Sequence, residues 1–446
     1  MADVSRRRVL QSIGAFGGAS ALHGSVPMAK RLPAPNGALV THWNSDPWAR
    51  GSYAVLRPGA TWGAHREATR VAAQRFVLAG EAFDPVAPGT MHGALRSGRQ
   101  AANELHAAIS KPDAQPVVII GAGLAGLCAA QRLRQLGHLV LVIDARNRLG
   151  GRVATSRKLG RPVELGAAWI HGTTGNELVN LVAKQGLTQT PTNYDDLIVR
   201  LPSGSTISPS VIATAQRQLS SAVERAQAQG EDSMSLQAGL DLVNYPSTAL
   251  ANWALTTEIV HEYADDPRLL NLQHFNDDED PRGGDVMVGG GLDRLVAKLA
   301  EGIPVRLSCP ATSIRPNARG VEITTKLGVF SGSAVVVTAP IGVLQGGGCP
   351  IDWNGFGAQR QHEAMQQFSM GDLEKVILTY PKKFWPKKQI MGLVGTPSQR
   401  FAEVYDLSTP SQPMLVAFTA GAAARSLPSS DVQTVALAQL ALTALL

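Results

Sequence analysis

The chain has 446 residues, of which 44% are hydrophobic and 17% charged. At roughly 150 residues per domain, this length predicts two or three domains. So large an apolar fraction excludes a disordered chain. The formal net charge of +6 is spread along the sequence, which argues against a nucleic-acid-binding surface. The three cysteines lack metal-ligand spacing, so we expect neither a disulfide framework nor a metal site. The sequence contains no run of about 18 apolar residues, so we expect no membrane-spanning helix.

The N-terminus carries the features of an export signal. Arg6, Arg7 and Arg8 precede a weakly apolar, glycine- and alanine-rich stretch, and residues 19–21 offer the small side chains that a signal peptidase accepts. A twin arginine in this setting resembles a Tat signal. We therefore expect residues 1–36 to be a Tat-like signal and linker, and the protein to be periplasmic or secreted after use of the Tat export machinery. The alternative is a basic N-terminal arm on a cytoplasmic protein.

A dinucleotide-binding pattern begins at residue 116. Residues 116–120 form a short apolar run typical of a strand that is buried on both faces. A G-x-G-x-x-G pattern follows at once over residues 121–126, and residues 124–136 carry a helical apolar pattern. The next apolar run, 139–143, ends at Asp144. This complete strand–helix–strand setting makes the glycine pattern informative, whereas an isolated G-x-G-x-x-G is weak.

Each residue of this pattern has a chemical reason. Gly121 allows a tight turn, Gly123 lets the backbone approach a pyrophosphate, and Gly126 lets helix and strand pack closely. The helix N-terminus attracts phosphate charge. The Asp144 carboxylate can accept hydrogen bonds from ribose hydroxyls. The alternative is a purely structural glycine turn.

Longer motifs resemble one family of flavoenzymes. Residues 144–152, which end in Leu-Gly-Gly-Arg, resemble the extended motif of the flavin-containing amine oxidases. Residues 164–176, with Gly-Ala-Ala-Trp-Ile-His at their centre, are similar to the polyamine oxidase branch, and the match also extends to the catalytic domain of the lysine-specific histone demethylase. Residues 289–295, 338–344 and 371–378 resemble later parts of the same family.

The order of these motifs is rotated. Residues 42–53, 76–82 and 89–98 resemble the C-terminal signature of the family, yet they precede the glycine pattern. The chain therefore resembles a circularly permuted amine oxidase. The alternative is a mosaic of fragments from two adjacent copies, which would need a partner chain or domain swapping.

The resemblance implies a fold of two discontinuous domains. Residues 57–190 and 283–345 are expected to form an α/β FAD-binding domain of the Rossmann-like, glutathione-reductase type. Residues 37–56, 191–282 and 346–446 are expected to form an α+β substrate domain, with helices over 208–229 and 246–264.

The resemblance also implies a reaction. A hydride equivalent passes from the carbon beside a neutral amine to flavin N5, the imine hydrolyses, and O2 reoxidises the flavin to give H2O2. Lys375 matches the lysine that binds N5 through a water molecule, and Tyr53 matches one wall of an aromatic cage. Thr90 stands where monoamine oxidases carry tyrosine, which implies a wider throat for long aliphatic amines. His171 matches the polyamine oxidase histidine near the substrate nitrogens.

The FAD site implied by the motifs is large. Ser52 replaces the cysteine through which monoamine oxidases attach FAD, so we expect the FAD to be noncovalent. The residues assigned to this site are Gly121, Gly123, Gly126, Asp144, Arg146, Gly150, Gly151, Arg152, Gly166, Ala167, Ala168, Trp169, Thr338, Trp43, Trp48, Gly80, Glu81 and Met91.

The sequence thus predicts an FAD-dependent oxidase of a small-molecule amine, with a polyamine such as spermidine or spermine as substrate. A monoamine or L-amino-acid oxidase on the same fold, and a flavin-binding scaffold without turnover, are the alternatives. The acidic residues 265–266 and 277–280 either line a mouth that attracts polycations or lie in solvated loops. The oligomeric state is left open.

Overall fold

The computed structural model describes residues 32–109, 111–277, 282–346, 351–395 and 398–446. The expected export signal therefore lies outside the described residues. The chain forms two compact units. The first, called here the Rossmann unit, comprises Trp43–Thr190 and Gln273–Gly371. The second, called the companion unit, comprises His42 and the described residues before it, Pro191–Leu272 and Asp372–Leu446.

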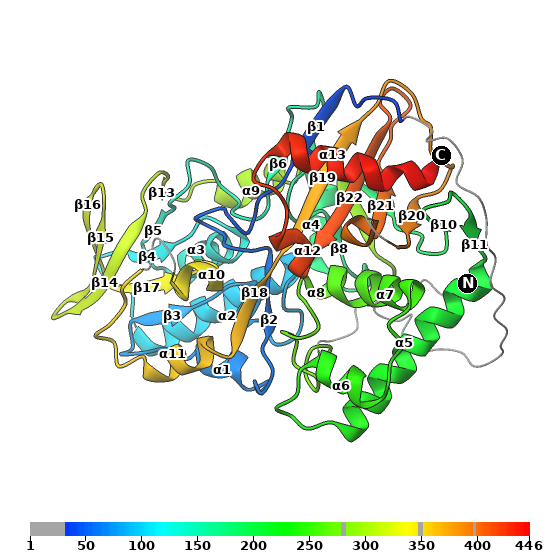
Figure 1. The fold of residues 1–446 in the computed structure, drawn as a ribbon. Helices are drawn as coiled ribbons and strands as arrows, with labels where there is room; N and C mark the ends of the chain where they lie inside the picture. The colour runs from blue at the N-terminus through cyan, green and yellow to red at the C-terminus, as the bar shows by residue number, and fades with distance from the viewer. Residues whose placement is uncertain (1–31, 110, 278–281, 347–350, 396–397) are drawn as a thin grey trace. The chain divides into compact units, whose positions relative to one another are not determined.

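A five-stranded parallel sheet forms the centre of the Rossmann unit (Figure 1). Its strands, in spatial order, are β13 (Val305–Arg306), β5 (Val140–Ile143), β4 (Val117–Ile120), β17 (Ala334–Val337) and β3 (Phe76–Leu78). The strand expected at residues 116–120 and the one expected at 139–143 are confirmed as β4 and β5. The edge strand β3 precedes β4 in the chain but pairs in parallel with β17, with Val335 opposite Phe76.

Alternation along β4 explains how this sheet is buried on both faces. Val117 and Ile119 pack into one core with α2 (Met91–Ile109), α3 (Leu124–Gln135), α4 (Glu177–Lys184) and α9 (Asp293–Ala300). Val118 and Ile120 pack into a second core on the opposite face. Successive side chains of a strand point to opposite faces, so an unbroken apolar run satisfies both cores.

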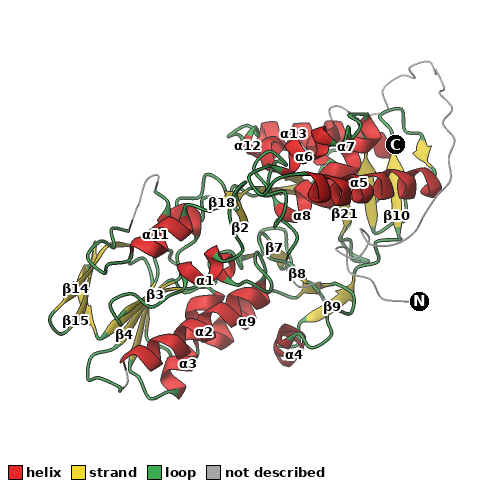
Figure 2. Ribbon diagram, turned by 90° about the horizontal axis from the view of Figure 1, so that it is seen from below, coloured by secondary structure: helices red, strands yellow, loops and turns green. Residues whose placement is uncertain are grey.

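The second core is closed by smaller elements. They are α1 (Ala64–Ala68), α10 (Ile341–Leu344), α11 (Gln359–Met365), the sheet of β14 (Ala311–Asn317), β15 (Gly320–Thr325) and β16 (Gly328–Gly332), and the pair of β2 (Tyr53–Leu56) with β18 (Phe368–Gly371). Figure 2 shows β14 and β15 beside the strands of the parallel sheet. The remaining pieces of this unit are β6 (Thr155–Ser156) with β7 (Val163–Glu164), and β8 (Trp169–Ile170) with β12 (Val286–Gly289) and β9 (Thr188–Pro191).

Helices α2 and α3 lie side by side over the parallel sheet (Figures 1 and 2). The approach is closest at Gly98, where an added Cβ would lie 2.1 Å from the carbonyl oxygen of Ala125. Real Cβ atoms do not approach an oxygen this closely, so any larger residue at 98 would force the helices apart. Glycine is unfavourable within a helix, and its presence here reflects this helix–helix contact.

The companion unit is built on a seven-stranded sheet. Its strands, in spatial order, are β1 (Gly37–Val40), β19 (Leu373–Thr379), β22 (Met414–Ala420), β21 (Glu403–Asp406), β20 (Ile390–Leu393), β10 (Leu197–Arg200) and β11 (Thr206–Ile207). All neighbours are antiparallel except β10 and β20. Val376, Leu378, Leu415 and Ala417 form a core with α13 (Asp431–Leu442).

The remaining elements of the companion unit are helical. They are α5 (Pro209–Gln229), α6 (Leu236–Leu242), α7 (Ala249–Leu255), the π-helical turn η3 (Thr256–Val260), α8 (His261–Tyr263), α12 (Gly421–Arg425) and two short 3-10 turns, η4 (Ser398–Phe401) and η5 (Thr443–Leu445). The helices expected over 208–229 and 246–264 are confirmed, although the second contains the π-helical turn. Trp253 of α7 donates a hydrogen bond through Nε1 to the carbonyl oxygen of Ala402, 3.0 Å away.

The units divide the chain differently from the expected domains. Residues 43–56 and the described part of 346–371 were expected in the substrate domain but belong to the Rossmann unit. The reason is that β2 pairs with β18, and Leu56 and Phe368 enter the second core beneath the parallel sheet. The described residues of 273–282 likewise fall in the Rossmann unit, not in the companion unit. Among the described residues, no helix is both long and apolar enough to cross a membrane.

Candidate cofactor and amine site

The turn between β4 and α3 has no room for side chains. Gly121 adopts φ +112°, and a Cβ there would lie 2.3 Å from Oγ1 of Thr338. A Cβ at Gly126 would lie 1.9 Å from the carbonyl oxygen of Gly121. Thr338 closes the arrangement by donating its hydroxyl to the carbonyl oxygen of Ile120, at 2.9 Å. These contacts agree with the roles predicted for Gly121 and Gly126, a tight turn and a close helix–strand approach.

Gly123 differs because it faces open space. A Cβ at Gly123 would meet only the carbonyl oxygen of Gly150, at 3.8 Å, and one at Gly151 would meet only Cα of Gly123, at 3.7 Å. Gly123 is the N-cap of α3 and supplies no side-chain cap. Bare backbone with uncapped N–H groups at a helix N-terminus suits an anionic diphosphate. The residues present therefore fit the diphosphate of a dinucleotide cofactor.

Asp144 lies at the carboxyl end of β5, beside this turn. Its Oδ2 accepts a hydrogen bond from the backbone N–H of Ala122 at 2.6 Å, and its Oδ1 accepts one from that of Arg146 at 2.7 Å. Burial raises the pKa of Asp144 above its usual range, and the two amide donors oppose that rise. The carboxylate thus ties the glycine turn to the next loop while lying where the ribose of a dinucleotide is expected.

The loop after β5 contains Arg146 and Arg148. Arg146 forms a bidentate pair with Asp46, with nitrogen–oxygen distances of 2.8 and 2.9 Å. Arg148 donates to the carbonyl oxygens of Leu149 and Gly151. Burial lowers the pKa of Arg148. Asp46 also accepts a hydrogen bond from the backbone N–H of Trp48 at 2.8 Å. The predicted cofactor residue Arg146 therefore holds, through Asp46, the segment that contains Trp48.

A second ion pair joins Glu81 to Arg152. Nη1 of Arg152 donates to Oε1 of Glu81 at 2.5 Å and to the carbonyl oxygen of Ser52 at 2.9 Å. Oε2 of Glu81 accepts from the backbone N–H of Gly89 at 3.1 Å. Gly80 has φ +149°, and its N–H donates to Ser97 of α2 at 3.0 Å. The structure thus brings together Ser52, Gly80, Glu81 and Arg152, which lie up to 100 positions apart in the chain.

The block from Gly166 to Trp169 packs against the same region. A Cβ at Gly166 would lie 1.8 Å from the carbonyl oxygen of Arg152, and Ala167 donates its N–H to that oxygen at 3.3 Å. Trp169 of β8 pairs with Met287 of β12, and the carbonyl oxygen of Ala168 accepts a hydrogen bond from the backbone N–H of Val288. Trp43 is buried, and its indole N–H donates to the carbonyl oxygen of Leu165 at 3.2 Å.

His171 has a buried partner that the sequence did not reveal. Its Nδ1 lies 3.0 Å from Oδ2 of Asp285, whose other oxygen accepts from the N–H of Gly172 at 2.9 Å. Asp285 is 1% exposed and the His171 side chain is 30% exposed. Because a carboxylate only accepts, Nδ1 carries a proton. Asp285 lies 114 positions away in the chain, and no motif linked the two residues.

Two predicted substrate residues lie near the start of α2. Thr90 is buried, its hydroxyl donates to the carbonyl oxygen of Ala87 at 2.8 Å, and it accepts from the N–H of Gly93 at 3.0 Å. Thr90 is thus the N-cap of α2, a role beyond the one predicted for it. Met91, the first residue of the helix, is buried. Tyr53 is half-buried at the start of β2, next to Gly89.

Lys375 belongs to the companion unit. It lies in β19 and is 5% exposed, with its Nζ 5.7 Å from the ring centroid of Phe418 on the neighbouring strand. Its backbone N–H donates to Oγ1 of Thr41 at 2.8 Å, and the same hydroxyl donates to Glu374 at 2.5 Å. The side chain of Lys375 is therefore buried in the sheet and does not extend to solvent.

On the same face of the sheet lies a buried histidine–glutamate pair that the sequence did not indicate. Phe418 of β22 pairs with Glu403 of β21 on one side and with Lys375 of β19 on the other. Nδ1 of His261 lies 3.4 Å from Oε2 of Glu403, and both side chains are buried. Paired residues of neighbouring strands share a face, so the sheet places these groups in one row.

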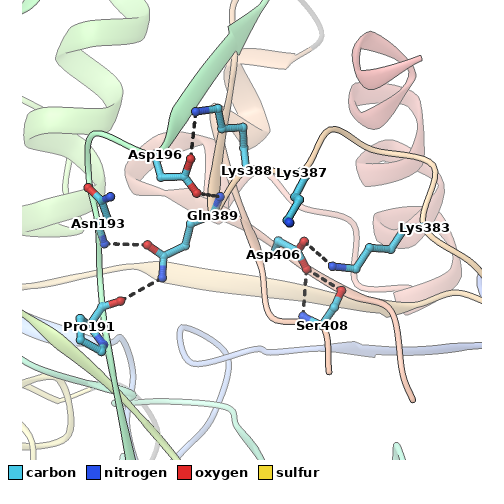
Figure 3. Close-up of a pocket in the computed structure, with 9 residues that line it drawn as sticks. All are labelled: Pro191, Asn193, Asp196, Lys383, Lys387, Lys388, Gln389, Asp406 and Ser408. Carbon is cyan, nitrogen blue, oxygen red and sulfur yellow. Dashed lines mark hydrogen bonds and ion pairs between the residues drawn. The ribbon is translucent and has the colours of Figure 1, made fainter. Parts of the chain in front are cut away.

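A polar cleft of about 360 Å³ lies elsewhere on the companion unit. Figure 3 shows that its two carboxylates are already bonded: Asp196 to Lys388, and Asp406 to Lys383, each at 2.9 Å. None of the predicted site residues lines it. We therefore assign it no part in cofactor binding.

Comparison with known proteins agrees with the motifs. The family described as flavin containing amine oxidoreductase matches residues 9–106 and 124–445. Probable polyamine oxidase 4 of Arabidopsis thaliana is 28% identical over 336 residues, covering 70% of this chain and 67% of that protein. Lysine-specific histone demethylase 1 homolog 3 of Oryza sativa subsp. indica is 32% identical over 338 residues, which span 70% of this chain but only 41% of that protein. A putrescine oxidase solved with putrescine has a TM-score of 0.59 at 22% identity, covering 74% of this chain and 81% of that one, and supports the fold alone.

Asp144→Asn tests the centre of the predicted nucleotide site. An asparagine would direct its NH2 group at one of the two amide N–H groups that the carboxylate now satisfies. Leaving a buried donor unsatisfied costs about 1–3 kcal/mol, so we expect flavin affinity to fall roughly 10- to 100-fold. Titration of the apoprotein with flavin measures this. Asp113→Asn, on an exposed turn before β4, is the control. Equal affinities for the two variants would remove Asp144 from the site.

Proposed function

Because the chain belongs to the family of flavin-containing amine oxidoreductases, we propose that it catalyses the FAD-dependent oxidation of a polyamine such as spermidine or spermine. The chain is a flavin-dependent amine oxidase by family. The observation that carries the choice of substrate is the similarity to plant polyamine oxidases over 70% of the chain. The wider throat that Thr90 implies agrees with a long aliphatic substrate.

FAD is the flavin that the Rossmann unit fits best. The open backbone between Gly123 and Gly151 suits a diphosphate, and Asp144 suits an adenosine ribose. A flavin mononucleotide has neither a diphosphate nor an adenosine ribose, so it could not make these contacts. When bound, the flavin supplies a two-electron acceptor for the C–H bond beside the amine.

The protein's own residues position the amine and control its proton. Lys375 is proposed to hold a water molecule that serves imine hydrolysis or the reaction with O2, and its burial keeps bulk water from competing for that role. Tyr53 is proposed as the aromatic wall that orients the nitrogen lone pair. His171, whose ring orientation is set by Asp285, is proposed to bind an internal nitrogen of the polyamine.

We propose that the FAD is noncovalent, because Ser52 cannot form the thioether that cysteine forms in monoamine oxidases. Precipitation of the protein with acid should therefore leave the yellow flavin in the supernatant. Flavin that stays with the precipitate would contradict this prediction.

Anaerobic mixing with a panel of amines tests the substrate. We expect spermidine and spermine to bleach the visible flavin band rapidly, whereas putrescine, phenethylamine and lysine should do so at least about tenfold more slowly, since one binding contact of ~1.4 kcal/mol separates them. Faster bleaching by phenethylamine or lysine would keep the fold but move the substrate to monoamines or amino acids. No bleaching by any amine would favour a flavin-binding scaffold.

Lys375→Met tests the proposed lysine. Methionine fills a similar volume without the amino group, so flavin should remain bound while reduction or reoxidation slows roughly 100-fold or more, the usual size of a proton-transfer contribution. Stopped-flow spectroscopy separates the two half-reactions. Lys387→Met, which changes an exposed lysine of the polar cleft, is the matched control. Half-reactions at the control rate would exclude Lys375 from the mechanism.

A further inference from the structure

Two buried carboxyl groups of the companion unit share one guanidinium. Nη2 of Arg425 donates to Oδ1 of Asp265, and Nη1 donates to Oδ2 of Asp372, each at 2.9 Å. The aspartate side chains are 1% and 4% exposed, and that of Arg425 is 31% exposed. Because Asp265 is buried, it can neither line a mouth that attracts polycations nor lie in a solvated loop.

The charges and hydrogen bonds of this triad do not balance without a further proton. Two carboxylates face one cation, and Oδ2 of Asp265 and Oδ1 of Asp372 are buried with no hydrogen-bond partner among the residues that the structure describes. A buried, uncompensated charge is costly, so such a group takes up a proton in place of remaining ionised. One proton on the pair makes the triad neutral and turns one of these two oxygens into a hydrogen-bond donor.

The triad lies where three elements meet. The backbone N–H of Asp372 donates to the carbonyl oxygen of Ala264 at 2.6 Å, at the end of α8. The carbonyl oxygen of Asp372 accepts from the N–H of Gly421 at 2.8 Å, at the start of α12. Ala264 and Gly421 both have positive φ, at 56° and 57°, so tight turns on each side deliver Asp265 and Arg425 to Asp372.

Asp372 immediately precedes β19, the strand that carries Lys375 three residues later. At ~3.3 Å per residue, the anchor is about 10 Å from the lysine along a single extended segment. Lys375 is also held by its pairing with Phe418 of β22 and by Thr41, which bonds both to its backbone and to Glu374. The triad adds a fixed point at the N-terminal end of the strand that carries the lysine.

We propose that Asp265, Arg425 and Asp372 are positioning residues for Lys375, and that the two aspartates hold one proton between them while they clamp the start of β19 to α8 and α12. This inference rests on the function proposed for Lys375, because positioning matters only if the lysine takes part in the reaction. It goes beyond that function by assigning the reaction a dependence on a proton remote from the lysine.

The direction of the pKa shifts agrees with the geometry. Burial raises the pKa of Asp372 from 3.8 to about 6, and burial also raises that of Asp265, while Arg425 opposes both shifts. A carboxyl pKa that is raised in the folded protein adds stability fully below pH 3.8 and loses it as the pH rises through about 6. The clamp should therefore loosen between pH 5 and pH 7, as a second negative charge forms.

The other charged groups near the triad have their own partners. Asp266, next in the chain, bonds to Arg268 at 2.9 Å. On α8, His261 lies against Glu403, and Glu262 follows it in the helix. On β19, Glu374 accepts from Thr41. The charge of Asp266 raises the pKa of Asp265, whereas Arg425 lowers it.

The holoenzyme variant Asp372→Asn tests the inference. The amide mimics a protonated carboxyl, so the clamp should stay closed at every pH. Thermal unfolding followed from pH 4.5 to 8 should show the wild type losing stability relative to the variant as the pH passes about 6. This first readout needs no substrate. Asp196→Asn, which breaks the partly exposed pair with Lys388 in the same unit, is the control and should follow the wild-type pH profile.

The second readout is anaerobic flavin reduction by spermidine over the same pH range. We expect the rate of the wild type to fall roughly tenfold relative to that of Asp372→Asn as the pH rises through 6, since small misplacements of catalytic groups cost 10- to 100-fold. The comparison with the variant removes the effect of pH on the amine itself, which is common to both proteins. Arg425→Lys should keep part of the clamp and retain this fall in rate, whereas Arg425→Gln should lose stability at high pH.

The outcomes separate this inference from the proposed function. Wild-type pH profiles for both unfolding and reduction in Asp372→Asn would overturn the inference. A changed unfolding profile with an unchanged reduction profile would show a merely structural triad and would overturn the positioning role. If Lys375→Met reacts normally, the function proposed for the lysine fails, and the positioning role fails with it, while the proton shared by the triad would still be seen in unfolding.

Discussion

The absence of space between β4 and α3 is the constraint on which the Rossmann unit depends. A Cβ at Gly121 or Gly126 would overlap Thr338 or the backbone of the turn itself. The close approach lets the parallel sheet bury both faces of Val117–Ile120 while the start of α3 stays beside the carboxyl ends of the strands. The same backbone is left bare at Gly123 and Gly151, so one packing constraint produces both the core and the surface that fits a diphosphate.

Buried carboxylates with fixed partners hold the loops of the protein in place. Asp144 binds two backbone N–H groups, Glu81 binds Arg152 and two further N–H groups, and Asp285 binds His171 and Gly172. Breaking one such pair leaves an uncompensated charge, which costs more than the pair itself contributes. These networks thus specify which loops lie together more than they add to stability. The Asp265–Arg425–Asp372 triad differs because its charges balance only with a proton.

Local sequence patterns predicted the elements around the candidate cofactor site. The apolar runs, the glycine spacing and Asp144 were sufficient to predict β4, α3 and β5, because each signal lies within 30 residues of the others. The same patterns could not predict that β3 pairs with β17, since Phe76 lies 259 positions before its pairing partner Val335. The expected boundary at residue 57 differed from the observed one for the same reason: the pairing of β2 with β18 is long-range.

The sequence by itself determined the family and the glycine turn between β4 and α3, because both depend on residue types at short, fixed spacings. Only the tertiary structure decided that Thr90 caps α2, that His171 lies against Asp285, and that Lys375 is buried beside Phe418. Each of these facts depends on burial or on a partner distant in the chain or across a turn. A sequence pattern specifies which groups are available, whereas packing decides which of them lose water and must find one another.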